Sequence, residues 1–137
     1  MANLSKSKYI TYCQCPKALW LKQYKSEEMV IDPLTQARFD AGTEVGELAK
    51  RLFGDFVEAT TYKTAADGTQ RLDLGAMAAA TQKALAEGAE NIAEAAFIYD
   101  GCYCAVDLLH KTPHGYAIYE VKSSTDLKEL EVYAQDV

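Results

Sequence analysis

Apolar residues recur with a helical period in three parts of the chain. The longest part follows Asp32-Pro33, a capping residue with proline at the first helical position, and continues to about Phe53-Gly54. Another is the alanine-rich segment 72–87, for which Gly88 is a suitable C-cap. Near the N-terminus, Ser5 can cap a helix that Pro16 interrupts and restarts. The pattern predicts helices in all three parts.

Residues 93–122 follow a strand pattern instead. Asp100-Gly101 is a strong two-residue hairpin turn, and residues 112–115 carry a second turn signal. Two turns at these positions divide the segment into three antiparallel strands, while a further short strand is expected at 56–61. Both faces of the three strands are rich in apolar residues, so helices should cover the sheet on both sides. The pattern predicts a mixed α/β (α+β) fold, with a central, mostly antiparallel meander flanked by helices.

Three acids and a lysine fall at matching positions of these strands. Glu94 and Asp107 are equally far from the first turn, and Asp107 and Glu120 are equally far from the second. The three acids should therefore lie side by side on one face, with Lys122 on the same face because strand side chains alternate. Like charges on neighbouring strands repel each other, so a divalent metal ion is the natural compensation.

Carboxylates and backbone carbonyls are the hard oxygen ligands that Mg²⁺ and Mn²⁺ prefer. We expect Asp107 and Glu120 to bind the metal directly, Glu94 to bind it directly or through water, and the carbonyl of Val121 to add a ligand. Such an ion activates a bound water and stabilises a leaving oxygen, while Lys122 would assist the nucleophile. The alternative is that the acids are ordinary solvent-facing residues, with Glu120 paired to Lys122.

The chain has 137 residues and a net charge of −6, which fits one globular domain and argues mildly against a nucleic-acid binder. However, residues 1–25 carry five lysines and no acid, so a basic surface there could meet phosphates. No apolar run approaches the roughly 18 residues of a membrane span, and the N-terminus lacks a signal-peptide pattern. We therefore expect a cytoplasmic protein without membrane contact.

The four cysteines form two Cys-x-Cys pairs. Cys102 and Cys104 fall on the strand face opposite the acids, where cysteine is commonly a small core residue. Because no export signal is present, disulfides are not expected. A tetrahedral Zn²⁺ site made by these two cysteines with Cys13 and Cys15 is a weaker alternative.

Asp107 with Glu120-Val121-Lys122 resembles the D…E-x-K core of the PD-(D/E)XK nuclease superfamily. Two earlier segments, YCQCPKALWL and GTEVGELAKRLF, resemble the N-terminal helices of its RecB-like members, which include CRISPR-associated and AddB-type nucleases and a bacterial domain of unknown function. The similar segments span roughly residues 4–125. The resemblance implies a restriction-endonuclease-like core and Mg²⁺- or Mn²⁺-dependent cleavage of DNA, with single strands or ends as candidate substrates.

In the iron–sulfur members of this group, one N-terminal cysteine joins three C-terminal ones around a [4Fe–4S] cluster. Cys15 matches that position, and Cys13 is a looser match. No cysteine follows Lys122, so the partner cysteines would lie beyond Val137. The segment after residue 125 also reads as the start of another element. We therefore expect the chain to be a single nuclease-like domain from the N-terminal part of a longer protein.

One position departs from the RecB-like pattern. Gly46 stands where many of these nucleases have a metal-binding histidine, with Glu44 or Glu47 as candidate replacements. This departure motivates an alternative function, that of a catalytically inactive nuclease-fold module that binds nucleic acid or a partner protein.

Overall fold

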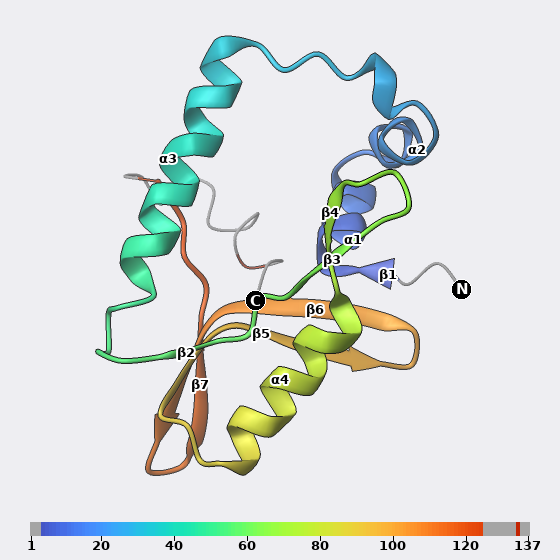
Figure 1. Cartoon of the computed structure of the whole chain (residues 1–137). Coiled ribbons are helices and arrows are strands. Elements are labelled where there is room, and N and C mark those ends of the chain that lie inside the picture. The colour runs from blue at the N-terminus through green and yellow to red at the C-terminus, as the bar shows by residue number, and fades with distance from the viewer. Residues whose placement is uncertain (1–3, 125–133, 135–137) are drawn as a thin grey trace.

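The chain adopts the predicted mixed α/β fold in the computed structural model, which describes residues 4–124 and 134 (Figure 1). The further element predicted after residue 125 lies outside the described residues. No helix in these ranges is long and apolar enough to cross a lipid bilayer. In chain order, the elements are β1 (Leu4–Ser5), α1 (Lys6–Gln14), α2 (Pro16–Tyr24), the 3₁₀ turn η1 (Ser26–Glu28), α3 (Pro33–Ala49), β2 (Val57–Glu58), β3 (Tyr62–Thr64), β4 (Gln70–Leu72), α4 (Leu74–Ala86), β5 (Asn91–Tyr99), β6 (Cys102–Thr112) and β7 (Gly115–Tyr119).

Strands β5, β6 and β7 form the predicted antiparallel meander. Ala95 pairs with Val106 across the first turn, and residue 109 pairs with residue 118 across the second, so both registers are as expected from the turns. Asp100 and Gly101 have φ values of 46° and 74°, the left-handed conformations that a type I′ hairpin turn requires. The residues of the two short turns therefore determine which residues pair across the three strands.

Two short parallel strands extend this meander into a five-stranded sheet. β2 pairs with β5. β1 pairs with the start of β6, and β7 pairs with the rest of β6 on the same side. The predicted strand at 56–61 is thus present as β2. β1 has only two residues, too few to produce a period in the sequence. It nevertheless brings the basic N-terminal segment next to the meander.

α1, α2 and α3 begin where the sequence predicts, whereas α4 begins at Leu74, two residues later than expected. The Ser5 hydroxyl accepts a hydrogen bond from the Lys8 amide (3.2 Å), and one oxygen of Asp32 accepts from the amides of Leu34 and Thr35 (2.9 and 3.0 Å). These caps satisfy amides that have no partner within the helix. α3 ends at Ala49, earlier than expected, because residues 50–54 form turns instead of a further helical turn.

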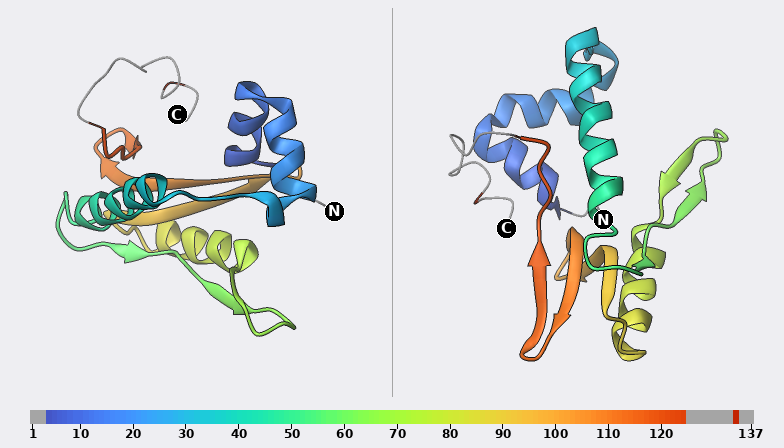
Figure 2. Two further views of the ribbon diagram at one scale, coloured as in Figure 1. Left: turned by 90° about the horizontal axis from the view of Figure 1, so that it is seen from above. Right: turned by 90° about the vertical axis from the view of Figure 1, so that its left-hand side faces the viewer.

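The buried core lies between α4 and the strands β5 and β6. Seen from above, α4 lies on one side of these strands and the α1–α2 pair on the other (Figure 2), as predicted from the apolar faces. The cover is incomplete, because Tyr99 is 85% exposed at the end of the β5–β6 hairpin. Cys102 at the same end is also exposed, so the prediction that it is a core residue is wrong. The start of α1 lies beside this end of the hairpin but leaves it partly open.

A buried asparagine holds the segment that follows α3 against the sheet. Asn91 is 4% exposed, and its Nδ2 donates to the carbonyl oxygens of Phe53 (3.1 Å) and Asp55 (2.9 Å). Its Oδ1 lies 2.7 Å from Nδ1 of His110 on β6, and the His110 ring stacks on Phe53. These contacts hold the residues that follow α3 against β5 and β6, and so position one wall of the cleft described below.

Thr81 links α4 to β5 through a buried hydrogen bond. It is fully buried, and its Oγ1 accepts from the Ala96 amide (2.8 Å) while donating to the Met77 carbonyl (3.0 Å). Thr81→Val keeps the shape but leaves that amide without a partner, so the free energy of unfolding should fall by about 1–3 kcal/mol. Thr81→Ser keeps the hydroxyl and should lose about 0.8 kcal/mol for the missing carbon. Denaturant unfolding of both variants measures the difference, and a valine variant as stable as the serine one would contradict this role.

Candidate functional site

A cleft of about 740 Å³ separates α3 from the ends of the central strands. It contains most of the residues that the sequence singled out, namely Glu94, Asp107, Val121 and Lys122. The remaining lining residues come mainly from α3, with two from the strand side: Arg38, Phe39, Gly42, Thr43, Gly46, Glu47, Lys50, Leu108 and Ser123. The fold thus brings together segments that are up to 85 residues apart in the sequence, from Arg38 to Ser123.

Asp107 is tied to the segment that follows β7. The Val121 amide donates to Oδ2 of Asp107 at 2.6 Å, although the regular pairing of β7 ends at Tyr119. This hydrogen bond occupies one acceptor position of the carboxylate and leaves its other lone pairs available. Asp107 therefore has a fixed orientation and remaining acceptor capacity beside Lys122, which lines the same cleft.

Glu94 lies in a strained backbone conformation at the same cleft. Its φ is 55°, which is uncommon for a residue with a side chain, while Ala93 and Ala95 on either side keep their pairing with β6. Burial raises the pKa of Glu94, and the neighbouring charge of Asp107 raises it further, against a lowering by Lys50. The two carboxyl groups thus repel each other, as the sequence predicted for this face.

Glu120 is the predicted site residue that does not line the cleft. Its Oε2 lies 2.9 Å from Nζ of Lys6, and its Oε1 lies 2.7 Å from Nζ of Lys122. The side chain is only 11% exposed, so this carboxylate lies between two ammonium groups with little access to water. The pairing of Glu120 with Lys122, which was the alternative to a metal site, is therefore present. Lys6 was not predicted as a partner.

Within residues 4–124 and 134, no three His, Cys, Asp or Glu side chains lie close enough together to hold a metal ion. Cys13 on α1 and Cys15 between α1 and α2 are exposed, while Cys102 and Cys104 line a separate hollow beside α1. Their predicted roles, in an iron–sulfur cluster for Cys13 and Cys15 or in a zinc site for all four, stay predictions.

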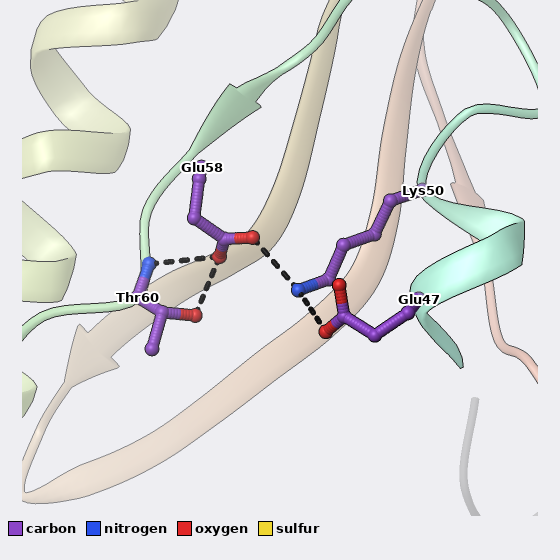
Figure 3. Close-up of polar contacts among 4 residues, drawn as sticks. All are labelled: Glu47, Lys50, Glu58 and Thr60. Atoms are coloured by element: carbon purple, nitrogen blue, oxygen red, sulfur yellow. Dashed lines mark hydrogen bonds and ion pairs between the residues drawn. The ribbon is translucent and has the colours of Figure 1, made fainter. Parts of the chain in front are cut away.

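A second charged cluster borders the cleft at the end of α3 (Figure 3). Nζ of Lys50 donates to Oε1 of Glu47 (2.7 Å) and Oε2 of Glu58 (2.8 Å), and Glu58 also accepts from the amide of Thr60 (3.1 Å). Burial opposes the charge of Lys50, but these two hydrogen bonds outweigh it and raise the pKa of Lys50 to about 12. Lys50 is therefore a permanent cation at neutral pH, close enough to Glu94 to lower its pKa.

The α3 wall was largely missed by the sequence analysis. Arg38 and Lys50 were not singled out, although they stand four residues before Gly42 and four after Gly46, on one helix face. Of the two candidate replacements for the missing histidine, Glu47 lines the cleft and Glu44 does not. The four-residue spacing around the two glycines was a signal that could have identified this face.

Comparisons of the chain with protein-family models, with curated proteins and with solved structures find no match. The assignment of function therefore rests on the sequence pattern and on the geometry of the cleft.

Proposed function

We propose that the chain is a divalent-metal-dependent nuclease domain that hydrolyses phosphodiester bonds of DNA. The observation that carries this proposal is the cleft itself, which is lined together by Glu94, Asp107, Val121 and Lys122. Two carboxylates that repel each other beside a lysine are a suitable environment for a hard cation and a phosphate. The match between these residues and the D…E-x-K pattern adds support from the sequence.

The donor set fits Mg²⁺ or Mn²⁺, because it consists of carboxylate oxygens whose repulsion a cation would relieve. Asp107 and Glu94 would hold the ion from the cleft side, with the carbonyl of Val121 as a further donor. The ion would supply a nucleophilic water and charge stabilisation at the phosphate. Asp107 is kept in orientation by the Val121 amide, and Lys122 neutralises negative charge that develops at the phosphate.

Glu120 is linked to this site through Lys122, which lines the cleft and pairs with its Oε1. A carboxylate has about four acceptor positions, so it can accept from Lys6 and Lys122 and still offer a lone pair to an ion. Lys6 in turn belongs to the basic N-terminal segment, which the pairing of β1 with β6 places beside the meander. The same ion pair thus links the candidate site to the positive charge that a nucleic-acid partner would need.

The experiment is a cleavage assay on purified protein with DNA and either Mg²⁺ or Mn²⁺. Wild type should cut, and both Glu120→Ala and Lys122→Ala should lose this activity, because each removes a charged group from the site. A chelator should abolish the reaction. Equal activity in the wild type and both variants would refute the proposal.

A catalytically inactive nuclease-fold module is the second candidate, and two observations favour it. Glu120 is held between two lysines, and Gly46 replaces the expected histidine. Calorimetric titration with Mn²⁺ separates the two functions, because a nuclease should show a metal affinity that depends on Asp107. Binding of nucleic acid or a partner protein without such an affinity would favour the module.

A further inference from the structure

The glycine at position 46 has no structural reason to be a glycine. It lies inside α3, where glycine destabilises a helix relative to alanine. Its backbone is helical, and a Cβ atom built there would have no heavy atom from elsewhere in residues 4–124 within 4 Å. Neither an unusual backbone conformation nor close packing requires the missing side chain. What the glycine leaves is open space on the side of the helix that lines the cleft.

Gly46 belongs to a face of α3 that has a cation at each end. Arg38, Gly42, Gly46 and Lys50 are spaced by four residues, which places them along one side of the helix, and all four line the cleft. A Cβ at Gly42 would lie 3.7 Å from Oγ of Ser123, so the other wall comes close there. The cleft is therefore wider at Gly46 than at Gly42.

We propose that this face of α3 is the track for the sugar–phosphate backbone of the substrate strand, with Gly46 providing the room and Arg38 binding a phosphate. The inference rests on the proposed nuclease function and names how that same site holds its substrate. It also gives Gly46 a role of its own: the position of the missing histidine is space for the substrate strand.

The ion pairing of the two cations at the ends of this face favours Arg38 over Lys50 as the phosphate ligand. Lys50 is already held by Glu47 and Glu58, whereas no carboxylate pairs with Arg38 among the described residues. A guanidinium group also matches a phosphate with two parallel hydrogen bonds. Eight residues separate Arg38 from Gly46, which is about 12 Å along the helix, or three to four phosphates of one B-form strand.

Glu47 does not offer an equivalent of the missing histidine in this arrangement. Its Oε1 accepts a hydrogen bond from Nζ of Lys50 at 2.7 Å, so the carboxylate is paired at the C-terminal end of α3. Glu47 lines the cleft but is paired with Lys50, so the α3 wall offers Arg38 as a cation without a carboxylate partner among the described residues, while Glu94 and Asp107 stand on the strand side. Substrate backbone on one wall and metal ligands on the other is the division of roles that we infer.

The first test fills the space at Gly46. Gly46→Leu should keep its fold and its Mn²⁺ affinity by calorimetry, but should bind a labelled DNA oligonucleotide about tenfold more weakly, measured by fluorescence anisotropy in EDTA. Ala41→Leu, at an exposed position of α3 outside the cleft, is the matched control and should bind like the wild type. Gly46→Ala should raise the unfolding midpoint, which would verify that the glycine is not needed for the fold.

The second test removes the proposed phosphate contact. Arg38→Gln should lower the slope of log binding constant against log salt concentration by about 0.7 to 0.9, the value expected for one lost phosphate contact, and should raise KM more than it lowers kcat. Arg51→Gln, an exposed arginine just after α3 that does not line the cleft, should leave the slope unchanged.

The two proposals can fail separately. If Gly46→Leu and Arg38→Gln bind the oligonucleotide as the wild type does, the track is refuted, even where the wild type cuts DNA. If the wild type binds no oligonucleotide, the track is refuted as well. If the wild type neither binds Mn²⁺ nor cuts, but both variants lose oligonucleotide binding, the nuclease function fails and the track stands as a nucleic-acid binding surface.

Discussion

Replacing Asp107 with asparagine is expected to reduce metal-dependent DNA cleavage by about a hundredfold or more. Asp107 lies on β6 between the Ala93–Leu108 and Ala95–Val106 pairs, and it lines the cleft together with Glu94 and Lys122. Asparagine keeps the shape and an oxygen that can still accept from the Val121 amide. The change therefore removes one negative charge and little of the structure.

Asp100→Asn is the matched control for this prediction. Asp100 lies at the β5–β6 turn with a φ of 46°, and asparagine before glycine is favoured in that type of turn. This variant should keep both cleavage and Mn²⁺ affinity, whereas Asp107→Asn should lose both while unfolding at a similar temperature. Cleavage rates and calorimetry on the two proteins provide the measurement. An Asp107 variant that binds Mn²⁺ and cuts like the control would mean that the cleft is not the active site.

The turns explain why the register of the candidate site could be predicted from the sequence. Asp100-Gly101 favours a single turn geometry, and Pro113 with Gly115 restricts the second turn to a few residues. Once both turns are fixed, the residues that face each other along β6 follow without knowledge of the rest of the fold. The positions of Glu94 and Asp107 are therefore consequences of local chemistry.

The surroundings of the acids could not be predicted in this way, because they depend on contacts between distant segments. Lys6 and Glu120 are separated by 114 positions, and they meet because the two-residue strand β1 pairs with β6. The α3 wall is placed by the hydrogen bonds of Asn91 to the residues that follow the helix. The left-handed backbone of Glu94 has no counterpart in its sequence context, since strand pairing continues on both sides of it.

Glu94→Gln is expected to make the protein more stable at neutral pH without metal. Burial and the charge of Asp107 raise the pKa of Glu94, so the folded state binds this proton more tightly than the unfolded chain does. For such a group, stability is lost as the pH rises from the ordinary value of 4.5 through the raised folded value. Glutamine cannot ionise and avoids the loss, so its unfolding midpoint should exceed that of the wild type by a few degrees at pH 7.

The pH dependence distinguishes this effect from a general gain in packing. Below pH 4.5 the wild-type carboxyl is protonated and resembles the amide, so the difference in midpoint should fade as the pH falls. Glu90→Gln, an exposed acid just before β5, should differ little from the wild type at any pH. Thermal unfolding in the presence of a chelator from about pH 4 to pH 8 gives the comparison. A constant difference across this range would contradict the electrostatic origin.

Adding Mn²⁺ should then reverse the order of the two proteins. An ion that binds only the folded state stabilises it by about 2.7 kcal/mol at a hundred times its dissociation constant, and the wild type should gain more than Glu94→Gln because it keeps both cleft carboxylates. The same repulsion that lowers stability in the absence of metal would thus favour ion binding. Equal gains in both proteins would instead place the ion away from Glu94.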